Sequence, residues 1–292
     1  MVTLDNQCLQ AFVSVAECTS FSVAAEHLHL TQSAVSKRIS ILEQQVGKKL
    51  FDRIARQVSL TEAGSALLPR ARHILQEQAS AIQAINDLSG DTQGTLRLAI
   101  SHHLGLHRLP PTLKAFARQY PKVNLDIEFM DSEKAYEQVL HGQSEVAVIT
   151  LALERHPNIL RKKIWTDPLR FICAPDHPLS EIDQPNLNDL AQYPVILPGL
   201  NTYTGRIIQN LFESRGIPLR SPMSTNYLET ISTMVEIGLG WSVLPETLVK
   251  NLHEMTIDHV TVTRELGYIH HMKRSLSNAA VAFLALLDTT QQ

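Results

Sequence analysis

Near the N-terminus, the spacing of apolar residues predicts two short helices joined by a tight turn. The first is expected over residues 23–29, with Ser22 as its N-cap. The second is expected to begin near Thr31 and to end at Gly47, since glycine readily adopts the left-handed conformation that ends helices. Its apolar residues recur at i, i+4, i+7 and i+11 and form one narrow stripe: Val35, Ile39, Leu42 and Val46. The opposite face is polar and basic, a shape that fits the major groove of DNA.

Amphipathic helices are predicted on both sides of this pair. Residues 4–17 form one, and the residues directed inward are Leu9, Phe12, Val13 and Ala16. Residues 61–88 form a long helix in which Pro69 is expected to kink or loosen the first turns. Its seam positions are Leu67, Ala71, Ile74, Gln78, Ala81, Ile85 and Leu88. These spacings of four and three make a heptad seam and favour pairing with a second copy, although a helix packed on its own domain is the alternative.

After a polar, glycine-containing hinge at residues 89–94, strands alternate with helices. In a first block we expect strands over residues 96–100, 123–129 and 145–149, and helices over residues 109–119 and 132–141. In a second block we expect strands over residues 169–174, 195–197 and 241–244, and helices over residues 204–215 and 227–237. A strand over residues 266–272 and a helix over residues 278–287 should return to the first block. This alternation predicts α/β architecture with a mostly parallel sheet.

The charge is localised. Residues 31–60 carry six cations and two acids, whereas residues 1–89 as a whole carry eight of each and the full chain of 292 residues has a net charge of −3. The basic surface is therefore a patch, which suits a DNA-facing head on a body of another kind. An ordinary helix pair with a solvated basic face is the alternative. No apolar run approaches the about 18 residues of a membrane span, and no secretory signal is evident, so we expect a cytoplasmic location without membrane contact.

The three cysteines, Cys8, Cys18 and Cys173, fit a reducing compartment. Buried, unreactive thiols are expected, because a disulfide switch in the larger body would need two thiols and residues 90–292 contain only Cys173.

The run AAEHLHLTQSAVSKRISILEQQVGKKLFDR, followed by LTEAG, resembles the N-terminal domain of LysR-type transcriptional regulators. The phrases LPPTLKAFARQYP, APDHPL and GLGWSVLP resemble landmarks of the effector domain of the same family. The resemblance implies a winged helix-turn-helix in residues 1–60, a linker and dimerisation helix in residues 61–89, and an effector-binding domain in residues 90–292. That domain would be like a periplasmic binding protein, with subdomain I (90–164 and 266–292), subdomain II (165–265), and two crossover strands, near residues 160–165 and 261–266, as the hinge.

The resemblance also implies which residues meet DNA. The second helix of the pair would read DNA, and its residues facing bases or phosphates would be Thr31, Gln32, Ser33, Ser36, Lys37 and Arg38. Arg53 and Arg56 would lie at the wing. Two positions depart from the family pattern: Ser33 replaces a common proline, and Gln57 stands where a second basic residue is frequent, which weakens the expected contact of the wing.

Ligands of open α/β sheets lie beyond the carboxyl ends of strands and between domains. Three segments qualify, and the resemblance points to the same three; their residues are Ser101, His102, His103, Thr150, Asn201, Thr202 and Tyr203. Thr202 would cap a helix whose free N–H groups favour an anion, and Tyr227 is a candidate for the rim. The alternative for each Ser or Thr is that it merely caps its own element.

The histidines invite a metal site. His102 and His103 precede His107 by a few residues, and His270 and His271 form a second pair. Adjacent residues of an extended segment point to opposite sides, and no cysteine or carboxylate with ligand spacing accompanies them, so we expect no metal and no cofactor. A polar wall of the ligand pocket is the expected role of His102 or His103.

These features predict a LysR-type, sequence-specific regulator of transcription, controlled by a small-molecule inducer that binds between two subdomains, with an anion as the candidate chemistry. Its expected partners are double-stranded DNA with an interrupted palindrome, the effector, further copies of the chain as a dimer of dimers, and RNA polymerase. No catalytic residue is expected, since no nucleophile elbow, P-loop or dinucleotide fingerprint is present. The alternatives are a regulator tuned by a partner protein or by thiol oxidation, and a solute-binding protein or enzyme on the same fold.

Overall fold

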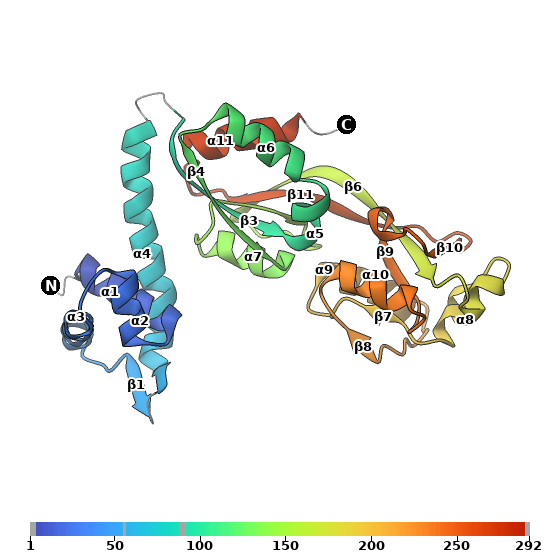
Figure 1. The fold of residues 1–292 in the computed structure, drawn as a ribbon, viewed down its shortest axis with the longest axis horizontal. Helices are drawn as coiled ribbons and strands as arrows, with labels where there is room; N and C mark the ends of the chain where they lie inside the picture. Colours follow the sequence, from blue (N-terminus) through green and yellow to red (C-terminus); the bar gives the residue numbers. More distant parts are fainter. Residues whose placement is uncertain (1–3, 55–56, 88–91, 290–292) are drawn as a thin grey trace. The chain divides into compact units, whose positions relative to one another are not determined.

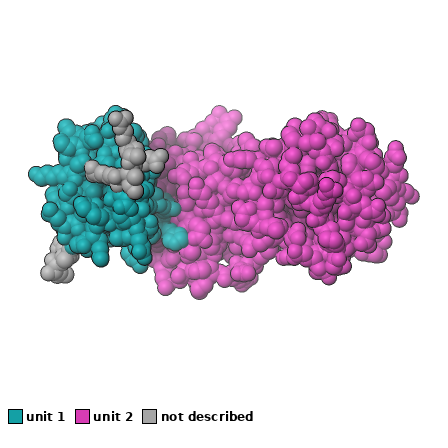
Figure 2. Space-filling model, turned by 90° about the horizontal axis from the view of Figure 1, so that it is seen from below, with its two compact units in different colours: residues 1–89, 141–143 teal, residues 90–140, 144–292 magenta. Residues whose placement is uncertain are grey.

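The computed structural model of the chain describes residues 4–54, 57–87 and 92–289. They fall into two compact units, shown in two colours in Figure 2. Unit 1 comprises residues 1–89 with 141–143, and unit 2 comprises residues 90–140 and 144–292.

Unit 1 contains a helical head, a two-stranded wing and a long helix (Figure 1). In chain order its elements are α1 (Asn6–Cys18), α2 (Phe21–His27), α3 (Gln32–Val46), β1 (Phe51–Ile54), β2 (Gln57–Leu60) and α4 (Glu62–Asp87). β1 and β2 pair antiparallel. Phe51 of β1 contacts Phe12 and Phe21, with ring centroids 5.4 and 5.8 Å apart, so the wing is anchored on the core of the head.

The helices of the head begin at side-chain caps. Asp5, Ser20 and Thr31 each accept a hydrogen bond from a backbone N–H in the first turn of α1, α2 and α3. The expected N-cap Ser22 is wrong: α2 begins two residues earlier than predicted, because Ser20 is the cap and Phe21 is buried in the core. The predicted boundaries of α3 are confirmed, and Gly47 ends it at φ 68°.

The interior of the head follows the predicted stripes with one shift. Val35, Ile39 and Leu42 of α3 are buried, as are Leu9 and Phe12 of α1. Val13 and Ala16, which were expected to face inward, are only partly buried, and the fully buried positions of α1 also include Ala11 and Val15.

The long helix α4 combines both structures considered for it. It continues through Pro69, and its N-terminal half packs on the head, with Ala71 completely buried. Further along, Ile74, Ile82 and Ile85 are 43%, 57% and 68% exposed. These three isoleucines, which lie between the middle of α4 and its C-terminal end, leave an apolar surface exposed on unit 1. Leu88, the last predicted seam position, lies outside the described residues.

Unit 2 is built on one seven-stranded sheet and a small two-stranded one. Its strands are β3 (Gly94–Ser101), β4 (Val123–Met130), β5 (Val146–Thr150), β6 (Ile159–Cys173), β7 (Ile196–Leu197), β8 (Met223–Ser224), β9 (Ser242–Pro245), β10 (His253–Met255) and β11 (Val262–His271). Its α-helices are α5 (His102–His107), α6 (Pro110–Gln119), α7 (Ser132–Leu140), α8 (Leu187–Ala191), α9 (Tyr203–Glu213), α10 (Leu228–Glu236) and α11 (Asn278–Asp288). The 3₁₀ turns are Pro178–Glu181 and Glu246–Leu248.

The sheet is mixed, so the expectation of a mostly parallel sheet is wrong. The large sheet has the order β10-β6-β11-β5-β3-β4, with β9 also paired to β6. β3 is parallel to β4 and β5, but β11 is antiparallel to both β5 and β6. The long strands β6 and β11 lie side by side within this sheet. Because they are antiparallel, they need no helical crossover of the kind that joins parallel neighbours.

β6 and β11 run through both halves of unit 2 (Figure 1). Ile164 of β6 and Tyr268 of β11 belong to a core with β3, α6 and α11. Phe171 and Val262, further along the same two strands, belong to a second core with α8, α9 and Trp241. Two hydrophobic cores are thus joined by one pair of continuous strands, where separate crossover and core strands had been predicted.

Among the described residues, no helix combines the length and the apolar character that crossing a membrane requires.

Candidate functional site

The first candidate site is the outer face of α3. Thr31, Gln32, Ser33 and Lys37 are exposed there, while Ser36 and Arg38 lie half-buried on its flank. Thr31 is also the N-cap of α3, accepting from Ala34 N at 3.2 Å, and its hydroxyl lies 3.0 Å from that of Ser33. The predicted residues therefore share one side of a capped helix, opposite its buried stripe.

Arg38 and Glu43 of α3 make side-chain hydrogen bonds to neighbouring segments of the head. Arg38 donates to Gln7 Oε1 at 2.8 Å, which holds the guanidinium near the start of α1. Glu43 accepts from Lys49 Nζ at 2.7 Å and from Leu50 N at 2.9 Å, and these bonds outweigh burial and lower the pKa of Glu43. Since Lys49 is neutralised by Glu43, Lys37 and Lys48 are exposed cations of this region without that compensation.

The wing residues predicted to bind DNA cannot be placed. Arg53 belongs to β1 by its backbone, but its side chain lies outside the described part, and Arg56 lies outside it altogether.

The second candidate site is a cavity of about 50 Å³ in unit 2. Its lining is Ser101, His102, His103, Met130, Asp131, Ser132, Glu133, Thr150, Pro198, Thr202, Thr204, Asn226, Leu228, Glu229 and Arg264. These residues come from both halves of the unit and meet beside β11. Most of them carry polar groups, and the volume is well below the roughly 300–1,000 Å³ of ordinary ligand pockets.

Five of the seven candidate residues from the sequence lie in the lining of this cavity. Ser101, His102, His103, Thr150 and Thr202 line it. Asn201 is exposed and Tyr203 is buried, and neither side chain is part of the lining. Tyr227 has its ring 5.0 Å from that of His102 and is 53% exposed, which places it beside the rim.

The expected extended segment after β3 is wrong, because residues 102–107 form helix α5. A Cβ at Gly105 would lie 2.4 Å from the Phe129 ring, so glycine allows this helix to pack closely on β4. Ser101 precedes the helix, but its side chain does not cap it. His103 and His107 consequently share one face of α5, with ring centroids 4.8 Å apart.

The N-terminus of α9, expected to attract an anion, is occupied by the protein itself. Thr202 donates to Gly199 O at 2.7 Å and accepts from Gly205 N at 3.0 Å, so its hydroxyl is engaged as a cap. The neighbouring Tyr203 N donates to the carboxylate of Glu133, which comes from α7. An internal carboxylate thus holds the position that was predicted for a ligand carboxylate.

Charge in the cavity is divided between acids and one arginine. Asp131, Glu133 and Glu229 contribute carboxylates, and Arg264 contributes a guanidinium that is 4% exposed. Arg264 Nε donates to Asp167 Oδ2 at 2.8 Å and Arg264 Nη1 donates to Thr204 Oγ1 at 3.0 Å. Its Nη2 is buried without a hydrogen-bond partner among the described residues, so it can donate to a ligand.

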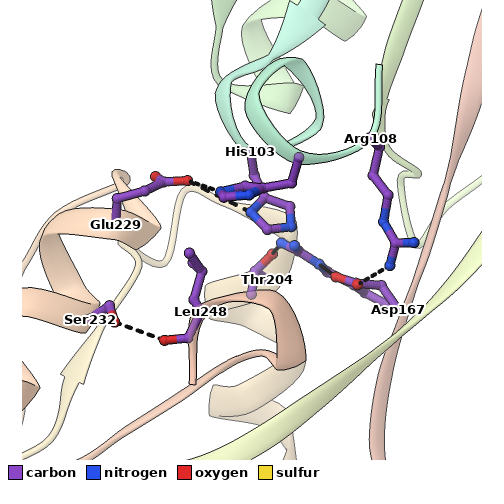
Figure 3. Close-up of polar contacts among 9 residues, drawn as sticks. His103, Arg108, Asp167, Thr204, Glu229, Ser232 and Leu248 are labelled. Carbon is purple, nitrogen blue, oxygen red and sulfur yellow. Dashed lines mark hydrogen bonds and ion pairs between the residues drawn. The ribbon is translucent and has the colours of Figure 1, made fainter. Parts of the chain in front are cut away.

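Several of these groups connect the two halves of unit 2. Asn226 donates to Asp131 Oδ2 at 2.7 Å, and its own oxygen accepts from Gly199 N at 3.2 Å. We call the contacts Asn226–Asp131 and Tyr203–Glu133 the clasp. His107 Nε2 lies 3.0 Å from Glu229 Oε1, and Figure 3 shows His103 and Glu229 facing each other from separate elements.

Two pKa values at this edge are shifted. Contact with His103 is the largest cause of a pKa of about 2 for Glu229, and the backbone N–H of Glu229 and the contact with His107 lower it further against the effect of burial. Burial lowers the pKa of His103. Although His103 Nδ1 is 3.8 Å from Glu229 Oε1, neither ring nitrogen of His103 makes a hydrogen bond within the described residues.

Two of the three cysteines, Cys8 and Cys173, are buried free thiols. Burial raises the pKa of Cys173 to about 11, and burial together with a hydrogen bond to Asp5 raises that of Cys8 to about 11. Thiolates are the reactive form, so these positions count against control by thiol oxidation.

Two family descriptions match the chain, one in each unit. The description "Bacterial regulatory helix-turn-helix protein, lysR family" matches residues 7–65, and "LysR substrate binding domain" matches residues 89–292. The transcriptional regulator CysB of Burkholderia cenocepacia is 32% identical over 239 residues, covering 80% of this chain and 76% of CysB. An uncharacterized HTH-type transcriptional regulator of Azotobacter vinelandii is 60% identical over 108 residues, covering 37% of this chain and 75% of the relative.

Among solved structures, full-length CbnR complexed with its target DNA has a TM-score of 0.70 at 23% identity, covering 98% of this chain and 99% of CbnR. This likeness confirms the fold that the sequence predicted: a helix-turn-helix head followed by an effector-binding domain of the LysR type.

The contact between the Glu133 carboxyl group and the N-terminus of α9 can be tested through the pH dependence of stability. Burial raises its pKa, and the Tyr203 N–H opposes the shift. A group with a raised folded-state pKa supports folding below its unfolded pKa and loses that support as pH rises through the folded pKa. Glu133→Gln keeps an acceptor but cannot ionise. Its free energy of unfolding, minus that of the wild type, should therefore increase between about pH 4 and about pH 7.5.

Urea unfolding at both pH values measures this difference. Glu213→Gln, which alters an exposed carboxylate on α9, is the matched control and should show a smaller pH dependence. A difference that falls as pH rises would contradict the position assigned to Glu133.

Proposed function

We propose, because this chain belongs to the LysR family of DNA-binding transcriptional regulators, that its α3 face reads an operator and that a small effector in the unit 2 cavity controls its action. The relatives described above are regulators, and the family is regulatory rather than enzymatic. In this proposal residues 1–60 form the DNA-binding domain, residues 61–89 the linker, and residues 90–292 the effector-binding domain. A regulator of this kind acts where the chromosome lies, in the cytoplasm.

The DNA-binding role is supported by the composition of α3. Thr31, Gln32 and Ser33 supply short hydrogen-bonding groups at the N-terminal end of the helix, which is the end that contacts base edges in helix-turn-helix proteins. Ser36, Lys37 and Arg38 are placed for phosphates or bases one turn further on. Arg53 and Arg56 of the wing complete the proposed interface.

The outer half of α4 supports a dimer. Ile74, Ile82 and Ile85 are exposed along it, and burying them against a second α4 would remove apolar surface from water. A two-fold dimer places two heads on the half-sites of an interrupted palindrome, and a dimer of dimers and contact with RNA polymerase extend the same scheme.

Sedimentation of Ile74→Asp should show a smaller species than the wild type; an unchanged species would remove this helix from the interface.

The effector role is carried by one observation: Arg264 lines a polar cavity, and one nitrogen of its buried guanidinium, Nη2, has no hydrogen-bond partner among the described residues. The hydroxyls of Ser101 and Thr150 lie in the same lining. An effector would offer an acceptor, such as a carboxylate, to Arg264 and donors, such as an amine or hydroxyl, to Asp131 and Glu133. The effector class is therefore a small polar molecule with both kinds of group, more specific than the simple anion expected from the sequence.

The small volume of the cavity supports a mechanism in which the two halves of unit 2 move apart to admit an effector. Because about 50 Å³ holds little more than water, a larger effector must separate the clasp residues. The two halves of unit 2 would then turn about β6 and β11, which are the strands common to both cores. A ligand can shift such an equilibrium only by its difference in affinity for the two forms, and about 1–3 kcal/mol is sufficient for regulation.

DNA binding is tested first at Lys37, the exposed cation of α3. Lys37→Ala should weaken binding to unrelated DNA sequences alike and should reduce the slope of log K against log salt by about 1, because one phosphate contact is lost. Fluorescence anisotropy over a series of salt concentrations measures both. Lys114→Ala, an exposed lysine on α6, is the matched control. An unchanged slope in Lys37→Ala would remove this lysine from the phosphate contacts.

Effector binding is tested by thermal melting against small amino acids, hydroxy acids and carboxylates. A ligand at 100 times its Kd should stabilise the protein by about 2.7 kcal/mol. Ser101→Ala should remove that shift, because Ser101 lines the cavity and its hydroxyl is not used to cap α5. Ser214→Ala, at the far end of α9, should retain it. An equal shift in both variants would place the ligand elsewhere.

A further inference from the structure

Three potential metal ligands converge at the edge of the cavity. His103 and His107 come from one face of α5, and Glu229 comes from the first turn of α10. One ligand atom from each side chain can be chosen so that all three lie within 4.8 Å of one another. The chain brings them together from positions 122 residues apart in sequence. His102 turns toward Tyr227 and stays outside this cluster.

The separations are close to those of a coordinated ion. His107 Nε2 is 3.0 Å and His103 Nδ1 is 3.8 Å from Glu229 Oε1. Ligand atoms around a tetrahedral zinc ion at about 2.0–2.1 Å are themselves separated by about 3.3–3.5 Å. The two imidazole nitrogens lie within 4.8 Å of each other, so side-chain rotations that bring them closer together would place all three atoms in coordinating positions.

His103 supplies an independent indication of a ligand. Its side chain is 6% exposed, and both of its ring nitrogens are buried without a hydrogen-bond partner among the described residues. Buried polar groups are normally hydrogen-bonded, and an unsatisfied one calls for an ion or another bound group. His107 and Glu229 are 28% and 34% exposed, so an ion can reach the cluster from solvent.

The surrounding charge is compatible with a cation. Arg264 lines the same cavity and shares the carboxylate of Asp167 with Arg108, at 2.8 and 3.3 Å, so this group carries one net positive charge, against which Glu229 of the cluster contributes one negative charge. Asp131 and Glu133 add further carboxylates to the lining. Figure 3 shows the pairs on either side: Arg108 and Asp167 together, and His103 with Glu229.

We propose that His103, His107 and Glu229 bind a divalent transition-metal ion, with Zn²⁺ as the best fit. Two imidazoles and one carboxylate suit zinc, whereas Ca²⁺ and Mg²⁺ prefer oxygen ligands throughout. Three protein ligands leave a fourth position for water or for a donor atom of an effector. This assignment replaces the expectation that no metal binds, which depended on an extended segment where the structure has helix α5.

The ion would join the two halves of unit 2. α5 packs with the β3–β4 side, and α10 packs with β7 and β9 on the other. A bound ion would hold α5 to α10 and favour the arrangement in which they meet. This regulatory consequence rests on the proposed function, since it requires that the angle between the halves controls DNA binding; the binding of the ion does not.

The test uses the full-length protein, treated with a chelator, and Zn²⁺ alone. Equilibrium dialysis with metal analysis should show one zinc per chain, and Co²⁺ in its place should give the visible absorption of a four-coordinate ion. His107→Gln and Glu229→Gln should each weaken binding at least tenfold and remove that absorption. Both residues are partly exposed, so their replacement should leave the fold intact, which circular dichroism checks.

His253→Ala removes an exposed histidine on β10 and is the matched control, which should bind zinc as the wild type does. Wild-type affinity in both His107→Gln and Glu229→Gln, or no stoichiometric zinc in the wild type, would overturn the site. Neither result depends on DNA. Failure of the zinc site therefore leaves operator binding and effector binding standing, and their failure would be seen in the Lys37 and Ser101 experiments instead.

Discussion

The buried ion pair of Asp167 and Arg264 lies where the two halves of unit 2 meet. The two residues are opposite each other on β6 and β11, and each is almost completely buried. Arg108 and Thr204 attach to the same pair, so it connects the segment after α5, both long strands and the start of α9. Removing one partner of such a pair typically costs about 3–5 kcal/mol, because the other charge stays buried and alone.

That pair sits where the strands pass from one hydrophobic core to the other. Apolar side chains could have packed equally well at this point of the two strands. A buried pair of charges must keep its partners, so it favours one defined pairing of β6 with β11. The other contacts described between the two halves of unit 2 are less deeply buried than this ion pair. The clasp and the His107–Glu229 contact are at least partly accessible and involve one hydrogen bond or ion pair each. In the proposed mechanism, the crossover is therefore the fixed part of the domain and the cavity is the part that a ligand would rearrange.

Local sequence patterns predicted the local structure. The stripe of α3, its cap at Thr31 and its end at Gly47 follow from side chains within a few turns of one another. The parallel sheet was mispredicted, because a strand's apolar alternation does not reveal the direction of its neighbours. α5 was missed because HHLGLH is too short for a helical period to show, and its helical form depends on how Gly105 fits against Phe129.

The candidate site was predictable only in part, for the same reason. Ser101, Thr150 and Thr202 end strands or begin helices, which is visible in sequence. Glu133, Arg264 and Glu229 reach the cavity through contacts with partners 70, 97 and 122 residues away, and no spacing along the chain encodes them. The charges that define the chemistry of the cavity are therefore the part that required the fold.

We propose that opening the cavity changes how the protein binds DNA. The most direct measurement is the operator affinity of Asn226→Ala, which breaks the contact with Asp131 but leaves the crossover and the head unchanged. Operator fragments can be selected from genomic DNA with the wild-type protein, and Asn210→Ala, an exposed position on α9, serves as the control. We predict at least a fivefold change in affinity or a changed footprint, which corresponds to about 1 kcal/mol of coupling. An affinity and footprint identical to those of the wild type would contradict the claim.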